Sequence, residues 1–275
     1  MRILKLIIIV LSFLVFLVLA FVVQIAVTFI RPSSRWHTIN RLTCGLIKFL
    51  RNVLGIRVNL EGHPEYLNEQ GNFLISRHIG YIDGIILGAL TPLTFISKKE
   101  IGDWPLIGKV VQISGTIFVD RQNRSRICHC LRKMAGRLKD QINLLIFPEG
   151  TSTDGSKVLP FQAPFFSVPI MTRSAIVPIT IEYHRLDGKT IAPENRDEIC
   201  WYNHMKFAPH LWNLLRFRRI DVRVVVHEKI STETYRNTSE DRKKLAQRCH
   251  QALVNFVKEH STAFNSDPFA ALDAA

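Results

Sequence analysis

The sequence has little cysteine, and the spacing of the cysteines matches no common pairing. Five are present in 275 residues and no C-x-x-C motif occurs, which argues against a disulfide framework and a thioredoxin-like redox motif. The segment Cys128-His129-Cys130 has no second ligand pair at the distance that zinc sites use, so we predict no metal site. Reduced thiols of this kind fit a protein that faces the cytosol.

Motifs for covalent catalysis are also missing. The chain has no G-x-S-x-G motif and no cysteine within a catalytic motif, so nothing predicts a covalent intermediate on serine or cysteine. Internal repeats and low-complexity tracts are absent too. The length of 275 residues therefore indicates one large domain, or one domain with an appendage.

Acidic residues are few relative to basic ones. The chain has 23 Asp and Glu against 36 Lys and Arg, and its net charge is +13. Such a charge suits nucleic acid, an anionic membrane surface or anionic substrates. No basic groove interleaved with aromatic residues is visible, so nucleic acid is not a predicted partner. The hydrophobic fraction of 47% is concentrated near the N-terminus, and this favours the membrane.

The N-terminal apolar run Leu6–Ile30 is interrupted by only three polar residues. As a helix it would extend roughly 37 Å, enough to cross a hydrocarbon core. It is too long for the apolar part of a signal peptide, and no small-x-small cleavage site follows it. Arg31-Pro32 would end this helix. More basic residues follow it than precede it, which predicts that the rest of the chain lies in the cytoplasm.

Residues 34–54 have the pattern of an amphipathic helix. Its polar side carries four basic or imidazole side chains, those of His37, Arg41, Lys48 and Arg51. A helix of this kind lies at a lipid interface or packs on the domain that follows it, and the pattern does not separate these two alternatives. We expect residues 1–54 to form a membrane anchor and residues 55–275 to form the main domain.

From Ile56 onward, short strands alternate with helices. This order predicts an α/β fold with a largely parallel mixed sheet flanked by helices. The expected strands are residues 56–60, 73–75, 93–96, 115–119, 144–147, 176–181 and 221–226, and the expected helices include 84–90, 127–138 and 238–259.

Four stretches are expected where strands end, which is where open α/β sheets bind ligands. They are residues 78–83, 115–121, 147–151 and 176–179. In the first, His78 follows an apolar strand and Asp83 comes five residues later. The carboxylate would accept a hydrogen bond from one ring nitrogen and leave the other free to take a proton from a substrate hydroxyl. His78 and Asp83 are therefore our candidate catalytic residues.

Three motifs together resemble the glycerolipid acyltransferases, the lysophosphatidic acid acyltransferase group with an H-x₄-D box. They are His78–Asp83, G-T-I-F-V-D-R at residues 115–121 and F-P-E-G-T at residues 147–151, and the resemblance covers about residues 36–230. It implies a membrane-bound O-acyltransferase that moves a fatty acyl group from a thioester, acyl-ACP or acyl-CoA, to a lyso-lipid hydroxyl. The implied acceptor is 1-acyl-sn-glycerol-3-phosphate, which would give phosphatidic acid. No further cofactor is implied.

The same resemblance implies a set of substrate-binding residues. Lys98, with Glu100 as its acid, and Arg121 would hold the head group, and guanidinium groups do suit phosphate. Glu149 resembles the acceptor-binding carboxylate of the family, although it could equally orient its own loop. Backbone N–H groups at Gly150 and Thr151 are candidates for stabilising the oxyanion. The expected location is the cell (inner) membrane, with the catalytic domain on the cytoplasmic side.

Three positions depart from the family pattern. Arg77 replaces an Asn, Gly80 replaces a small hydroxyl residue, and Ser152 replaces an Arg expected to touch phosphate. The form around Ser152 also resembles members that acylate lyso-ornithine lipid, so this acceptor is an alternative. Two alternatives of other classes are a catalytically inactive binding protein that recruits a partner to the membrane, and a hydrolase with a metal held by His78, Asp83 and Glu149.

Overall fold

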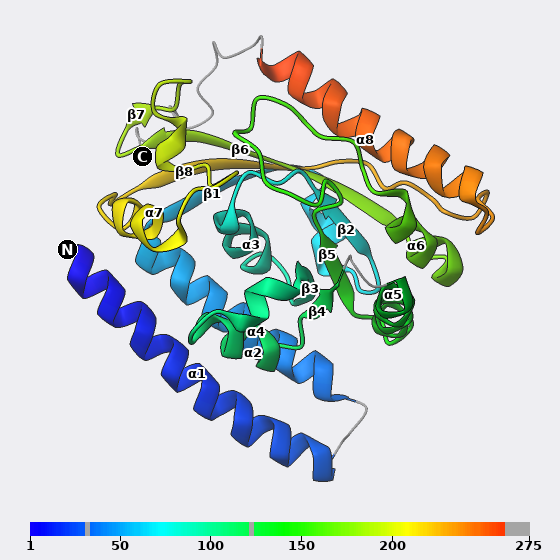
Figure 1. Ribbon diagram of the computed structural model, residues 1–275, viewed down its shortest axis with the longest axis horizontal. Helices are drawn as coiled ribbons and strands as arrows, with labels where there is room; N and C mark the ends of the chain where they lie inside the picture. The colour runs from blue at the N-terminus through cyan, green and yellow to red at the C-terminus, as the bar shows by residue number, and fades with distance from the viewer. Residues whose placement is uncertain (31–33, 121–123, 262–275) are drawn as a thin grey trace.

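The computed structural model describes residues 1–30, 34–120 and 124–261. Its centre is a sheet in the order β1-β8-β6-β2-β5-β3-β4, with β7 paired to β6. All strand pairs are parallel except those that β6 makes with β7 and β8. The prediction of a largely parallel mixed sheet is confirmed (Figure 1). The strands are β1 Ile56–Gly62, β2 Phe73–Ser76, β3 Leu93–Lys98, β4 Ile117–Val119, β5 Asn143–Ile146, β6 Ile176–Leu186, β7 Lys189–Thr190 and β8 Ile220–Val226.

Helices cover both faces of the sheet. The side chains of β2 show why, because Leu74 packs with the helices of one face while Phe73 and Ile75 pack with those of the other. In Figure 1, α8 lies above the sheet and α1 and α2 lie below it. The helices are α1 Arg2–Ile30, α2 Arg35–Leu54, α3 Tyr81–Gly88, α4 Ile107–Ile113, α5 Arg124–Lys139, α6 Ser167–Thr172, α7 Phe207–Leu214 and α8 Ser239–Ser261.

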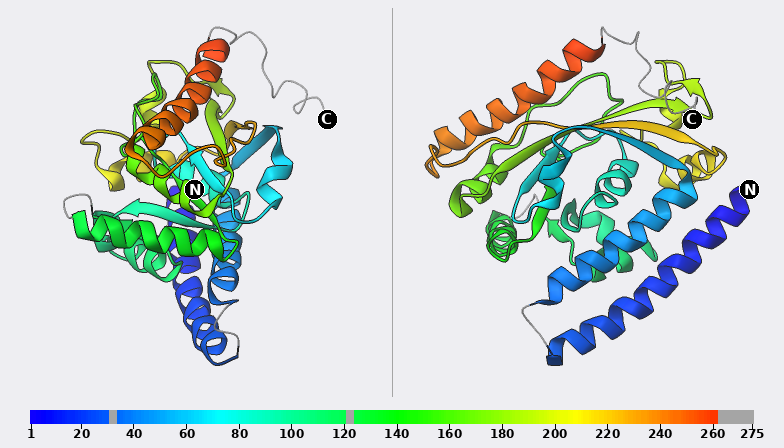
Figure 2. Two further views of the ribbon diagram at one scale, coloured as in Figure 1. Left: turned by 90° about the vertical axis from the view of Figure 1, so that its right-hand side faces the viewer. Right: turned by 180° about the vertical axis from the view of Figure 1, so that it is seen from behind.

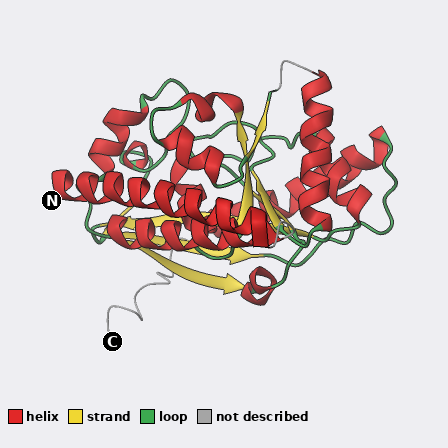
Figure 3. Ribbon diagram, turned by 90° about the horizontal axis from the view of Figure 1, so that it is seen from below, coloured by secondary structure: helices red, strands yellow, loops and turns green. Residues whose placement is uncertain are grey.

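Helices α1 and α2 run side by side beneath the domain (Figures 2 and 3). One face of α1 is buried at Ile9, Phe16 and Ala20. Two polar contacts tie its ends to the domain: Lys5 Nζ donates to the Phe217 carbonyl at 2.7 Å and Gln24 Nε2 to the Ile113 carbonyl at 3.1 Å. Its other face is exposed and apolar, and its residues 2–27 are long and apolar enough to span a membrane.

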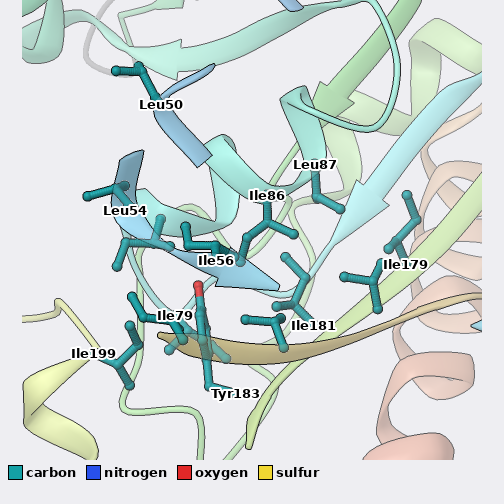
Figure 4. Packing of buried hydrophobic residues seen from close by; sticks show 14 of the residues in the cluster. Leu50, Leu54, Ile56, Ile79, Ile86, Leu87, Ile179, Ile181, Tyr183 and Ile199 are labelled. Atoms are coloured by element: carbon teal, nitrogen blue, oxygen red, sulfur yellow. The ribbon is translucent and has the colours of Figure 1, made fainter. Parts of the chain in front are cut away.

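Helix α2 packs on the domain. Its apolar side, which includes Ile39, Ile47 and Leu50, is buried, and Asn40 Nδ2 donates to Thr94 Oγ1 at 3.0 Å. Figure 4 shows Leu50 and Leu54 in the same apolar cluster as side chains from the sheet. The opposite side of α2 is exposed at Arg41 and Lys48. The apolar side of this amphipathic helix is therefore covered by the protein itself.

Most expected elements differ from the structure by a few residues at an end, and two of these differences bear on the site. Helix α3 begins at Tyr81 instead of residue 84, because Asp83 lies in its first turn and accepts hydrogen bonds from the backbone that leads into the helix. Residues 176–179 do not end a strand. They begin β6, which continues to Leu186 because it pairs with β8 over its later part.

Candidate active site

His78 and Asp83 lie at the carboxyl end of β2, where the chain turns into α3. The predicted hydrogen bond between them is present: His78 Nδ1 donates to Asp83 Oδ2 at 2.8 Å. The Asp83 side chain is completely buried, whereas 22% of the His78 side chain is exposed. Because the carboxylate accepts from Nδ1, the neutral ring has its proton there, and Nε2 is the nitrogen that can accept one from a substrate.

The Asp83 carboxylate is fixed by three further donors. Oδ2 also accepts from the backbone N–H groups of Ile79 at 2.7 Å and Gly80 at 2.9 Å, while Oδ1 accepts from the Tyr183 hydroxyl at 2.6 Å. Hydrogen bonds to a charged group contribute about 1.5–3 kcal/mol each. They offset the cost of burying this carboxylate and prevent it from rotating away from His78.

Tyr183 is a site residue that the sequence analysis missed. It lies on β6 in the same apolar cluster as Ile179 and Ile181, at alternate positions of the strand (Figure 4). Burial raises its pKa well above the ordinary value, so the phenol remains a donor. Continuing the period-2 pattern of β6 past residue 181 would have placed Tyr183 on the face that meets α3.

The F-P-E-G-T turn after β5 packs directly on the histidine. The Phe147 ring stacks on the His78 ring with 4.1 Å between centroids. Glu149 is buried, and its two carboxylate oxygens accept from the backbone N–H groups of His78 at 2.8 Å and Leu159 at 2.9 Å. Burial raises the pKa of Glu149, although these two hydrogen bonds oppose the shift. Of the two roles left open for Glu149, its geometry favours orienting the loops over touching a substrate.

Thr153 completes the link between the two loops and was not predicted. Its backbone N–H donates to the His78 carbonyl at 2.9 Å, so the His78 backbone is held at both its N–H and its C=O. The Gly150 N–H donates to the Phe147 carbonyl at 3.1 Å. This N–H is used within the turn, so a role in stabilising an oxyanion, which stays a prediction, would require the turn to release it. Thr151 is exposed at the tip of the turn.

The predicted basic residues lie farther along the same edge of the sheet. Lys98 ends β3 and is exposed beside Val119 of β4. Strand β5 separates β3 from β2, so about 10 Å, two strand spacings, lies between the ends that carry Lys98 and His78. Lys98 and Glu100, both among the described residues, form no ion pair with each other. The ion pairs at this end of the sheet join Asp120 to Lys99 and to Arg126. Arg121 lies outside the described residues.

Two of the departures from the family pattern have structural explanations. Arg77 is buried and turned away from His78, with its Nε donating to the Ile181 carbonyl at 3.1 Å and Nη1 to the Gly155 carbonyl at 3.3 Å. It therefore braces β6 and the loop after the F-P-E-G-T turn. Gly80 lies against Trp201, whose backbone nitrogen would be 3.1 Å from an added Cβ, so this position has little room for a side chain.

The carboxylates of the site do not converge on a common point. The Asp83 carboxylate already accepts four hydrogen bonds, and the two oxygens of Glu149 accept from two backbone N–H groups. Within the described part of the chain, no group of three His, Cys, Asp or Glu side chains could hold a metal ion. The arrangement therefore does not favour the metal-dependent hydrolase among our alternatives.

An α/β sheet with an oriented histidine at its carboxyl edge is an arrangement with which enzymes can activate a substrate group. Comparisons with known proteins give the family. The acyltransferase family model matches residues 57–182. The lyso-ornithine lipid O-acyltransferase of Rhodobacter capsulatus is 33% identical, over 76% of this chain and 73% of its own length. That of Pseudomonas aeruginosa is 34% identical, over 78% of this chain and 77% of its own length. The chain belongs to the acyltransferase family.

Other relatives extend this comparison. The 1-acyl-sn-glycerol-3-phosphate acyltransferase of Neisseria meningitidis is 28% identical, over 70% of this chain and 71% of its own. The crystal structure of the 1-acyl-sn-glycerophosphate acyltransferase PlsC from Thermotoga maritima superposes with a TM-score of 0.61 at 19% identity, covering 94% of this chain and 98% of that one. This structural likeness confirms the fold, including the helices that precede the sheet.

Proposed function

We propose that this acyltransferase moves a fatty acyl group from a thioester to the free hydroxyl of a lyso-lipid at a membrane. The observation that carries the proposal is the His78–Asp83 pair, in which a buried carboxylate fixes Nδ1–H and leaves Nε2 on the partly exposed side of the ring. An imidazole held in this way can accept a hydroxyl proton as that oxygen attacks, an effect of roughly 10²–10⁴ in rate.

The reaction then proceeds by direct attack. His78 Nε2 takes the proton of the acceptor hydroxyl while the oxygen adds to the thioester carbonyl, and Asp83 stabilises the imidazolium that forms. The tetrahedral intermediate collapses by breaking the C–S bond, and the thiolate takes the proton from His78. The products are the new oxygen ester and a free thiol. No protein nucleophile is acylated in this sequence.

Two lyso-lipids are candidates for the acceptor. The motifs favour 1-acyl-sn-glycerol-3-phosphate, as does the relative from Neisseria meningitidis. Lyso-ornithine lipid is favoured by Ser152, which stands where an arginine for phosphate is expected, and by the relatives from Rhodobacter capsulatus and Pseudomonas aeruginosa. We propose lyso-ornithine lipid as the preferred acceptor, because its support combines a residue of the site with two relatives that are 33% and 34% identical over more than three quarters of the chain.

The acceptor assay is a direct test. Purified protein in mixed micelles is given one acyl thioester and either lyso-lipid, and the new ester is measured by mass spectrometry. We expect ester formation with lyso-ornithine lipid to have the higher kcat/KM. Faster transfer to 1-acyl-sn-glycerol-3-phosphate would reverse the assignment, and transfer to neither would favour the inactive, membrane-recruiting alternative.

Helix α1 supports the proposal of a membrane partner. Its exposed face is apolar from Ile3 to Ile30, while its other face is packed on the domain, so the exposed face is the one available to lipid. We place the protein at the inner membrane with the domain on the cytoplasmic side, where an anionic leaflet attracts a chain of net charge +13. Cell fractionation and protease accessibility of the domain test this location. An acyl carrier protein or coenzyme A would present the thioester as a co-substrate from the same side.

A further inference from the structure

A groove of about 780 Å³ lies beside β4. One wall is α5, another is β4, and Trp36 of α2 stands at one end. Strand β4 is an edge strand of the sheet, so no further strand covers this side. The groove is of the size that binds small molecules and cofactors.

The side of α5 that faces the groove carries a row of three cationic side chains and one imidazole. They are Arg126, His129, Lys133 and Arg137, at spacings of three and four residues that place them on one face of the helix. The row extends for about 16 Å. Helix α5 contains no Asp or Glu, so neighbours on the helix do not neutralise the row.

Of the described residues that line the groove, the acidic ones are Asp120 and Asp140. Asp120 is paired with Arg126 at 2.7 Å and with Lys99 at 3.7 Å, so its charge is already compensated. Asp140 is at the opposite end, near Arg137. Lys133 lies between them and forms no ion pair with any residue that the structure describes. The middle of the groove therefore has an uncompensated positive charge.

Arg137 adds a second observation. Its guanidinium stacks on the Trp36 ring at 3.6 Å from the ring centroid, and its Nε is buried without a hydrogen-bond partner in the described residues. Burial lowers the pKa of Arg137 to about 10. A desolvated cation with an unused donor gains stability when an anion binds beside it.

The floor of the groove is apolar and open. Ile117, Phe118 and Cys130 line it, and an added Cβ at Gly136 would meet no atom within 4 Å. A ligand here would thus find an apolar floor beneath a basic rim. This suits an extended organic chain that carries a phosphate, more than a free inorganic anion.

The groove opens near the edge of the sheet that holds His78. Lys99 and Asp120 line it where β3 and β4 end, and β4 is three strands from β2 in the order β2-β5-β3-β4. Three strand spacings are about 14 Å. A thioester at His78 could therefore be joined to a phosphate in the groove by a linear arm of about that length.

We propose that this groove binds the phosphorylated arm of the acyl donor. Coenzyme A and acyl carrier protein share this chemistry, because both present the acyl thioester on a pantetheine arm that ends in a phosphate. The phosphate would lie against the α5 row, and the arm would cross the carboxyl ends of β3 and β5 so that its thioester reaches His78. This inference rests on the proposed function, which requires a thioester donor but does not say where it binds.

Two variants change the groove in different ways. Lys133→Glu reverses one charge of the row, and Gly136→Leu fills the open space without an initial clash. Each has a matched control. The control for Lys133→Glu is Arg132→Glu, the same charge change at an exposed position of α5 that does not line the groove. The control for Gly136→Leu is Gly45→Leu, at a helical glycine of α2 where an added Cβ likewise meets no atom within 4 Å. Folding of all four is checked by thermal unfolding.

The experiment measures KM and kcat for palmitoyl-CoA and for palmitoyl-acyl carrier protein at saturating lyso-lipid, and the affinity for CoA and for holo-acyl carrier protein without turnover. We expect Lys133→Glu and Gly136→Leu to raise the donor KM roughly tenfold, with kcat and the acceptor KM unchanged and both controls near wild type. An effect confined to CoA or to the carrier protein supports the site and identifies which donor uses it.

Other results would overturn the proposal. One is a donor KM in Lys133→Glu and Gly136→Leu no higher than in the controls. Another is weakened sedimentation with phosphatidylglycerol vesicles at an unchanged donor KM, which would assign the groove to an anionic lipid. If wild-type protein acylates no lyso-lipid, the proposed function fails by itself. The binding measurements with CoA and holo-acyl carrier protein still decide whether the groove is the donor site.

Discussion

The two ends of the functional edge of the sheet hold their charged side chains in opposite ways. At β2, Asp83 is completely buried and accepts four hydrogen bonds, and the His78 backbone is held at both its N–H and its C=O. At β3 and β4, Lys98 and Lys99 are exposed, and the side chain of Arg126 is 57% exposed. The β2 end fixes the positions of His78 and Asp83, as a reaction that makes and breaks covalent bonds requires. The second presents charge to a ligand that arrives from solvent or membrane.

The comparison predicts that changes at the β2 end lower kcat and that changes at the β3–β4 end raise KM. The largest effect is expected from Asp83→Asn. The amide can donate to His78 Nδ1, which would move the ring proton to Nε2 and leave no base for the hydroxyl. The same exchange in Ser-His-Asp triads lowers kcat by about 10⁴, and we expect a loss of that order.

Steady-state kinetics of Asp83→Asn should be compared with those of Asp221→Asn. Asp221 is a buried carboxylate of β8 that is paired with Arg219. Its replacement should cost stability in thermal unfolding while leaving kcat of the folded fraction close to wild type. An equal fall in kcat for both variants would mean that any buried aspartate of the sheet matters as much as Asp83.

Glu149→Gln is expected to have the next largest effect. Its side-chain nitrogen cannot accept from a backbone N–H, so either His78 or Leu159 loses its acceptor, at a cost of about 1–3 kcal/mol. If the His78 loop shifts as a result, kcat should fall by roughly tenfold to a hundredfold. An acceptor KM that rises with unchanged kcat would instead assign Glu149 to substrate binding.

Tyr183→Phe keeps the ring but removes the hydroxyl that donates to Asp83. We expect kcat to fall about tenfold with little change in KM, because the carboxylate loses one of its four donors. Tyr202→Phe is a matched control, since Tyr202 also donates to a carboxylate, that of Asp197 at 2.8 Å, but at an exposed position. Similar kinetics in the two variants would remove Tyr183 from the account.

The smallest effect is expected at the exposed end, from Lys98→Gln. The side chain is solvated, so an interaction with a carboxylate or phosphate of the head group should contribute only about 0.2–1 kcal/mol. The acceptor KM should rise up to about fivefold at low salt, kcat should be unchanged, and the difference should shrink as salt is added. Lys189→Gln on β7 is the control. A large fall in kcat for Lys98→Gln would place that lysine among the reacting groups.

Local patterns in the sequence were sufficient for much of the fold. The apolar run Phe73–Ile75 is a strand whose side chains are all buried. Gly55 ends α2 with a positive φ of 74°, where a Cβ would meet the Arg218 carbonyl. The His78–Asp83 contact was also predictable, because both residues belong to one strand-to-helix turn.

The rest of the site depends on contacts between distant segments. The hydrogen bond between Tyr183 and Asp83 joins residues 100 positions apart, and that between His78 and Glu149 joins residues 71 positions apart. A local sequence pattern cannot predict contacts over such separations. The amphipathic pattern of α2 likewise indicates an apolar face but not whether lipid or protein covers it. The motif at Gly150 likewise does not show that its backbone N–H donates to the Phe147 carbonyl within the turn.

The most direct test of the account is acyl transfer by His78→Ala in mixed micelles with the preferred lyso-lipid, measured beside the binding of CoA and holo-acyl carrier protein. The account predicts that kcat falls by at least about 10² while donor binding and thermal unfolding stay near wild type. Transfer by His78→Ala at a rate close to wild type would contradict it.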